Sequence, residues 1–180
     1  WEDGLAQRDI LYGIGYRQTS IVGEYKQPIY ENFSIRYRLG FDTTEVETEP
    51  YSLARELMYR ENKFRASAIA NWEINKDHQL AFGAEYVKED FGLKAEGKNN
   101  TFNYRMGDKK DMPIWSTDMF SLVTEHQWII FDKITTFLSA RMDDHTYSQP
   151  MFSPRATVVF TPTEKDTVKL MASRATRTNV

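Results

Sequence analysis

Residues 32–42 read NFSIRYRLGFD, and the stretch alternates between polar and apolar side chains throughout. Its odd-numbered positions carry Phe33, Ile35, Tyr37, Leu39 and Phe41, and its even-numbered positions carry Ser34, Arg36, Arg38, Gly40 and Asp42. A helix would scatter the five apolar side chains around its axis, whereas a strand places all five on one face. The stretch therefore predicts a β-strand with one apolar face and one polar face.

The same period of two recurs along the chain. It is found in segments that begin near Phe64, Leu80, Ile134, Ala156 and Val168. In the first of these, Ile69 is an exception on the polar parity. The pattern is less regular over Phe120–Ile130, because Thr124 and His126 fall on the apolar parity, and weakest over Tyr16–Tyr25. These segments predict an all-β, antiparallel, up-and-down fold of about eight strands.

The links between the segments alternate in length. Short, turn-like links are expected at Lys26–Pro28, Asn75–Asp77, Phe131–Lys133 and Thr161–Asp166. Longer polar links are expected at Thr43–Arg55 and Gly92–Pro113, with a shorter one at Tyr147–Phe152. Transmembrane β-barrels have short turns on one side and long loops on the other, and strands of about 10 residues cross the bilayer.

The composition agrees with this class. The chain has 180 residues, enough for one domain over residues 1–180, and its mean hydropathy is −0.60. Strict alternation keeps the mean hydropathy low even in a transmembrane barrel. The absence of cysteine excludes disulfides, thiolate metal sites and cysteine nucleophiles. A net charge of −3 without a basic block argues against nucleic acid as a partner.

Aromatic residues gather at the ends of the predicted strands. One group lies near the short turns and consists of Trp72, Trp128, Phe131 and Phe160. A second lies near the longer links and consists of Tyr86, Phe91, Trp115 and Tyr147. Two such groups are typical of the girdles at the two membrane interfaces. The alternative is that aromatic residues are simply common in strands.

The C-terminal quarter carries a family resemblance. Residues 152–163 read FSPRATVVFTPT and lead into DTVKLMASRATR at residues 166–177. The pair resembles the mid-barrel signature of TonB-dependent outer-membrane receptors, in which Ser-Pro-Arg opens one strand and a Pro-Thr turn follows. Ala140–His145 stands where that family often has Gly-x-Arg-x-Asp. The resemblance covers roughly residues 64–177, but Thr176 replaces the family's aromatic residue, and nothing resembles the plug or the TonB-binding motif.

The resemblance implies that residues 1–180 form part of a transmembrane barrel of the 22-stranded, plugged type. Its expected location is the bacterial cell outer membrane, and its expected role is uptake of a scarce nutrient such as a ferric siderophore. The implied partners are outer-membrane lipid, a siderophore-like ligand, and the TonB complex through a plug region outside this chain. The start at Trp1 and the end at Val180 fit an excerpt. The alternative is a closed eight-stranded barrel with a structural or passive-pore role.

Charges on the polar parity are expected to face the lumen. They are Arg36, Arg38, Arg65, Glu85, Glu89, Glu125, Arg141, Asp143, Arg155 and Lys169. They either pair with a plug and line the route of an anionic ligand, or form a hydrated wall. The link Gly92–Pro113 adds a ligand-capture hypothesis for an anionic iron chelate, with the alternative of a variable surface loop. That hypothesis rests on Lys94, Lys98, Phe102, Tyr104 and Arg105.

Other readings predict different chemistry. Asp143, Asp144 and His145 could activate water in a hydrolase, but neighbours on a strand point to opposite faces, so we expect no catalytic residues. His78 and His126 show no metal-ligand spacing, so each is interpreted as an interface or lumen histidine, with no metal or cofactor site. A soluble β-sandwich would bury residues of the apolar parity in a core. The residues that test it are Phe33, Tyr37, Phe82 and Leu138.

Overall fold

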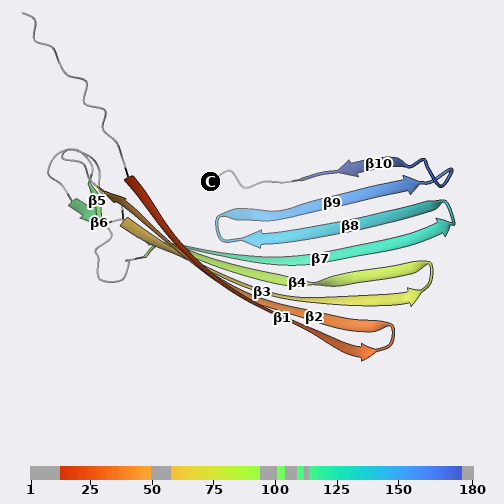
Figure 1. Ribbon diagram of the computed structural model, residues 1–180, viewed down its shortest axis with the longest axis horizontal. Coiled ribbons are helices and arrows are strands. Elements are labelled where there is room, and N and C mark those ends of the chain that lie inside the picture. Colours follow the sequence, from red (N-terminus) through yellow and green to blue (C-terminus); the bar gives the residue numbers. More distant parts are fainter. Residues whose placement is uncertain (1–12, 50–57, 94–100, 104–108, 112–113, 176–180) are drawn as a thin grey trace, which may run out of the picture. The chain divides into compact units, whose positions relative to one another are not determined.

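The computed structural model describes residues 13–49, 58–93, 101–103, 109–111 and 114–175 (Figure 1). Within these ranges the chain is all β. The strands are β1 (Gly13–Tyr30), β2 (Phe33–Glu49), β3 (Met58–Asn75), β4 (His78–Leu93), β5 (Thr101–Asn103), β6 (Lys109–Asp111), β7 (Trp115–Phe131), β8 (Ile134–His145), β9 (Ser148–Phe160) and β10 (Val168–Ser173). In this part of the chain, no helix is long and apolar enough to cross a membrane.

Eight strands form one sheet in the order β1-β2-β3-β4-β7-β8-β9-β10, and β5 pairs with β6 in a small hairpin. Neighbours in the sheet are also neighbours along the chain, apart from the inserted hairpin, so the topology is up-and-down (Figure 1). The pairings β7–β8, β8–β9 and β9–β10 are antiparallel. The predicted all-β, antiparallel, eight-stranded fold is confirmed.

The registers carry the sequence alternation across neighbouring strands. His126 lies opposite Leu138, and Leu138 lies opposite Ala156. On the other parity, Ser121 lies opposite Asp143, and Ser139 lies opposite Arg155. Directly paired residues share a face. We call the side bearing Leu138 the apolar face and the side bearing Ser139 the polar face.

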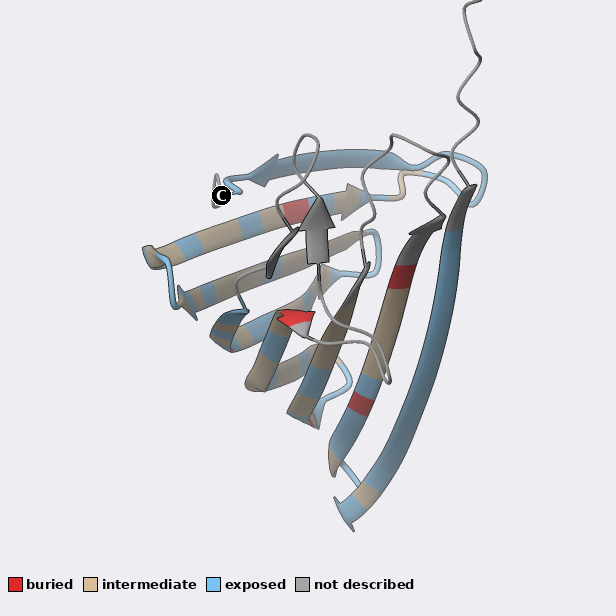
Figure 2. Cartoon of the chain, turned by 90° about the vertical axis from the view of Figure 1, so that its left-hand side faces the viewer, coloured by how far each residue is buried: buried red, intermediate tan, exposed pale blue. Residues whose placement is uncertain are grey.

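The apolar face is open rather than packed. Tyr37, Phe82 and Leu138 are 38%, 42% and 51% exposed. Among the described residues, Val46 and Ala70 are the only buried apolar side chains, and exposed and half-buried positions dominate the strands in Figure 2. A sandwich would bury these aromatic and aliphatic groups between two sheets. The soluble β-sandwich alternative is therefore wrong for this part of the chain.

The chain divides into two compact units. The first takes in residues 1–20, 42–62 and 90–116, and the second residues 21–41, 63–89 and 117–180. In the first, the Glu45 carboxylate forms ion pairs with Arg17, at 3.7 Å, and with Arg60. The residues discussed as a site below belong to the second unit.

Several strands run further than the alternation predicted. β1 includes the predicted turn Lys26–Pro28, and the chain turns at Glu31–Asn32 instead. β1 continues through Pro28, although proline has no backbone N–H to donate to a neighbouring strand. The turn is joined to β3 by two hydrogen bonds: the Glu73 amide donates to the Asn32 carbonyl, at 2.8 Å, and the Asn32 side chain donates to the Glu73 carbonyl, at 3.1 Å.

Two of the links predicted from the sequence are shorter in the structure, because strands extend into them. β2 continues to Glu49, so residues 43–49 are strand, while 50–57 lie outside the described residues. β9 begins at Ser148, leaving a tight turn at Thr146–Tyr147. Backbone pairing can continue where side chains are polar on both faces, and such stretches look like loops in the sequence. The other predicted short turns, at Asn75–Asp77, Phe131–Lys133 and Thr161–Asp166, are confirmed.

β4 and β3 approach closely at Gly83. A Cβ built on Gly83 would lie 2.1 Å from the Ala68 carbonyl oxygen and 2.8 Å from the Ile69 Cα. The Ile69 side chain occupies the space beside it, with its Cδ1 at 2.9 Å from that position. Ile69, the exception on the polar parity, therefore lies over a glycine that leaves room for it.

Candidate functional site

The polar face carries a network of charged side chains centred on Arg141 of β8. Its Nη1 donates to Glu85 Oε2 of β4 at 2.6 Å, and its Nε donates to Asp143 Oδ1 at 2.7 Å. Alternation along a strand places Arg141 and Asp143 on the same face. Three of the predicted lumen-facing charges thus meet, although Glu85 is separated from Arg141 by 56 positions in the sequence.

Ser121 of β7 completes this network, which we call the Arg141 cluster. Its hydroxyl donates to Asp143 Oδ1 at 2.5 Å and accepts from Arg141 Nη2 at 2.8 Å. Ser121 is 0% exposed and Asp143 is 14% exposed, so the cluster is partly shielded from water. Hydrogen bonds between charged groups are about twice as strong as neutral ones. Sequence reasoning missed Ser121, and its position on the polar parity of β7 was the one signal available.

Among the described residues of the second unit, two further ion pairs lie outside the cluster. Lys63 of β3 pairs with Glu89 of β4, and Arg36 of β2 lies 4.0 Å from Glu24 of β1. Both pairs are half exposed, so each contributes little to stability. Neither Glu24 nor Lys63 was among the predicted residues, although Lys63 shares the polar parity of Arg65 in the sequence.

Four of the other predicted charges have no side-chain partner among the described residues. Across the described ranges, no ion pair or side-chain hydrogen bond involves Arg38, Glu125, Arg155 or Lys169. Arg155 lies opposite Ser139, and Lys169 lies opposite Val159, so the register places both on the polar face. Arg38 and Arg65 line a cavity of about 240 Å³ together with Glu85. The polar face thus holds both satisfied and available charges.

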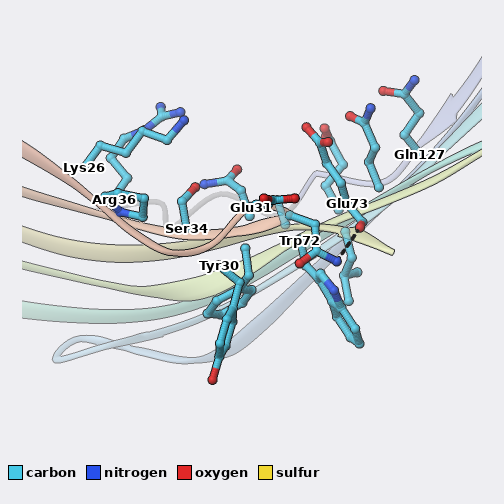
Figure 3. A pocket seen from close by; sticks show the side chains of 16 residues that line it. Lys26, Tyr30, Glu31, Ser34, Arg36, Trp72, Glu73 and Gln127 are labelled. Carbon is cyan, nitrogen blue, oxygen red and sulfur yellow. Dashed lines mark hydrogen bonds between the residues drawn. The ribbon is translucent and has the colours of Figure 1, made fainter. Parts of the chain in front are cut away.

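A groove of about 400 Å³ opens near the short turns, and we call it the turn-side groove. Its charged and amide side chains come from β1, β2, β3, β4, β7 and the β1–β2 turn: Lys26, Glu31, Asn32, Arg36, Asn71, Glu73, Gln79, Glu125 and Gln127. Figure 3 shows Ser34, Glu73 and Gln127 on one side of the sheet and Tyr30 and Trp72 on the other. The groove is therefore a polar recess.

A second recess of about 320 Å³ lies along β7, β8 and β9. Arg141 and Arg155 line it together with Ser139, Ser153 and Ser173. Arg174 also lines it, so Arg155, Arg174 and the serine hydroxyls offer hydrogen-bond donors, whereas the Arg141 guanidinium is already bound in the Arg141 cluster. Such a surface can bind carboxylate or phosphate groups, or the backbone of another polypeptide segment.

The residues of the hydrolase hypothesis do not converge. Asp143 is bound in the Arg141 cluster, while Asp144 lies opposite Phe120 on the other parity. The ring of His145 accepts from the Tyr147 amide at 3.2 Å. Among the described residues, no group of three or more His, Cys, Asp or Glu residues could hold a metal ion.

The predicted capture loop is only partly described. β5 and β6 form a hairpin within Gly92–Pro113, with Phe102 paired to Lys110. Lys94, Lys98, Tyr104 and Arg105 lie outside the described residues. The ligand-capture hypothesis for this loop remains a prediction.

The chain is similar in structure to solved receptors. A mutant of the ferric enterobactin receptor PfeA from Pseudomonas aeruginosa matches over 89% of this chain, with a TM-score of 0.71 and 17% identity. The siderophore receptor PirA from Acinetobacter baumannii matches over 88%, with a TM-score of 0.65 and 18% identity. The RagAB peptide transporter matches over 83%, with a TM-score of 0.61 and 14% identity. No protein-family model and no curated protein sequence matches the chain.

These likenesses concern the fold alone, because every identity is low. The chain spans 25% of the PfeA chain, 24% of the PirA chain and 20% of the RagAB chain. Its sheet is thus built like a stretch of an outer-membrane receptor barrel.

Proposed function

We propose that this chain is part of the barrel wall of an outer-membrane transporter in a bacterium, one that takes up a scarce nutrient such as a ferric siderophore. The observation that carries the proposal is the two-faced sheet: one face exposes large apolar side chains, and the other gathers charges. Exposed apolar patches of this size on a protein in water are rare. Lipid outside and a polar lumen inside explain both faces.

The apolar stretch of each strand has the length that a transmembrane strand needs. Its apolar stretches run over Phe33–Phe41 in β2, Phe64–Ile74 in β3 and Ile134–Met142 in β8. Each covers about 9–11 residues, the length of a tilted transmembrane strand. The strands continue beyond it, and charges then occupy the same parity, at Glu45, Arg60 and Asp144. This pattern supports lipid contact limited to a band, with the strand extensions in water.

The sheet is open at both ends of its strand order. β1 and β10 are the end strands, and within the described residues no pairing between them closes the eight-stranded sheet. An unpaired edge invites a further strand. This favours a wall section of a larger barrel of the 22-stranded type over the alternative of a closed eight-stranded barrel with a structural or passive-pore role.

The polar face would line the lumen and contact a plug. The turn-side groove presents both signs of charge, since Lys26 and Arg36 line it together with Glu73 and Glu125. In the proposed transporter the plug is a separate segment outside this chain, and it links the barrel to the TonB complex. A ligand such as a ferric siderophore would pass between plug and wall, and the available arginines suit an anionic cargo.

Paired cysteine substitutions test the membrane orientation. The chain has no cysteine, so Leu138→Cys and Ser139→Cys each introduce a single thiol, on adjacent residues of opposite faces. In reconstituted vesicles, a fluorophore at residue 138 should be quenched by nitroxide-labelled acyl chains, and one at residue 139 should not. Equal quenching of the two labels would contradict a lipid-facing apolar face.

Uptake by cells that carry the complete protein tests the cargo and the energy source. Uptake of an iron-labelled siderophore should require TonB, and the coding sequence upstream of Trp1 should contain a plug. Passive entry of small solutes without TonB, with no plug encoded, would favour the eight-stranded pore instead.

A further inference from the structure

The two strands β4 and β7 bring His78 and His126 together on the apolar face. His78 Nδ1 lies 3.1 Å from His126 Nε2, although 48 positions separate the two residues in the sequence. The rings are nearly parallel, at 4°, with centroids 5.2 Å apart. His126 was an irregularity of the apolar parity in β7, and this contact accounts for it.

The pair is held in place by its neighbours. The Trp128 ring stacks against His78, with centroids 5.4 Å apart and an interplanar angle of 20°. The His78 amide donates to Asn75 Oδ1 at 3.0 Å in the β3–β4 turn, which fixes the start of β4. Both histidines are half-buried rather than enclosed, and His78 directly follows the β3–β4 turn, so water and ions can reach the pair from that turn.

The nitrogen separation fits a shared metal ion. Imidazole nitrogens bind Zn²⁺ at about 2.0–2.1 Å. Two such bonds to nitrogens 3.1 Å apart subtend an angle of about 100° at the metal, between the angles of tetragonal and tetrahedral sites. Metal binding requires each ring to turn about χ2, a broad torsion in histidine, until both lone pairs meet at one point.

We propose that His78 and His126 form a two-histidine site for a borderline divalent transition-metal ion, on the outer surface of the sheet and apart from any lumen route. The metal takes the place of the hydrogen shared between the two neutral rings, and the ring that donated it takes up a proton from solvent at its other nitrogen, so both ligands stay neutral imidazoles and no net proton is released. Among the described residues no cluster supplies a third such protein ligand, so water fills the remaining positions. Imidazole ligands favour Cu²⁺, with Ni²⁺ and Zn²⁺ weaker.

Metal titration of the purified, complete protein in detergent, with any histidine tag removed, tests the site. Cu²⁺, Ni²⁺ and Zn²⁺ are added separately, and binding is followed by calorimetry. One equivalent of Cu²⁺ should bind tightest, and either His78→Ala or His126→Ala should weaken it at least about tenfold, since even loss of an outer-shell partner costs 10–100-fold.

The remaining histidine of the chain provides the matched control. His145→Ala should leave Cu²⁺ affinity unchanged, because His145 is the last residue of β8, at the other end of that strand from the β7–β8 turn, and accepts from Tyr147. His126→Gln, which retains hydrogen-bonding capacity, serves if an alanine variant fails to fold. Electron paramagnetic resonance should show two imidazole nitrogens on Cu²⁺ in the unaltered protein and one in His126→Gln. Unchanged affinity in the His78 and His126 variants, or loss in His145→Ala, would overturn the site.

Discussion

The Arg141 cluster and the turn-side groove lie on the same polar face, yet their charges are satisfied in different ways. In the cluster, one guanidinium donates to two carboxylates and a buried hydroxyl. In the groove, Glu125 and Lys26 have no ion pair within the described part of the chain. The cluster is complete within this chain, whereas the groove leaves polar groups for water or for another segment.

This contrast between the Arg141 cluster and the turn-side groove indicates two roles for side chains on the polar face. Side chains that satisfy one another fix neighbouring strands, here β4, β7 and β8. Side chains that stay available stabilise the fold little and can exchange water for a partner at low cost. A plug that must dock and rearrange would gain more from the second kind. The following substitutions test this division, starting with the largest expected effect.

Gly83→Ala should be the most damaging change. The new Cβ would meet the Ala68 carbonyl oxygen and the Ile69 Cα, which are backbone atoms and cannot move aside without shifting β3. We expect a loss of about 3 kcal/mol or more in the free energy of unfolding, measured by denaturant titration of the reconstituted protein. Gly23→Ala is the control, because no atom lies within 4 Å of its added Cβ. Similar stability of the two variants would refute a close β3–β4 approach.

Arg141→Gln should have the next largest effect. It leaves Asp143 and Glu85 without their cation, and Asp143 is mostly shielded from water. Because Arg141 itself is partly exposed, we expect a loss of about 2 kcal/mol in the free energy of unfolding rather than the larger cost of a fully buried pair. Arg155→Gln, on the neighbouring strand and without a side-chain partner, should cost less than about 0.5 kcal/mol. Equal losses in the free energy of unfolding of the two variants would show that the interactions of the Arg141 cluster do not stabilise the sheet.

Glu125→Gln in the turn-side groove should have the smallest effect on stability, below about 0.5 kcal/mol, because no ion pair is lost. If the groove receives a plug, the same substitution should still lower the salt sensitivity of plug association, measured by release of a labelled plug segment. A large loss of stability would mean that Glu125 belongs to the wall's own network, and the contrast between cluster and groove would then disappear.

Much of the fold could be predicted from local chemistry. Residues 32–42 and the later alternating segments determined strand type, and Asn75–Asp77 determined a turn, since side-chain parity and turn chemistry depend on neighbours in the sequence. The strand ends could not be predicted the same way. Residues 43–49, apart from Val46, and residues 148–150 lack an apolar parity, and only pairing with a neighbouring strand shows them to be β.

The sequence by itself determined which charges could share the polar face. Side chains alternate between the two sides of a strand, so the positions that carry apolar residues identify the remaining positions as the polar face. It did not determine which of them meet. Arg141 reaches Glu85, and His78 reaches His126, through the register between strands distant in the sequence. A shift of one residue would send each side chain to the opposite face. The tertiary structure decided these contacts because register is fixed by the whole ladder of backbone hydrogen bonds, not by any one strand.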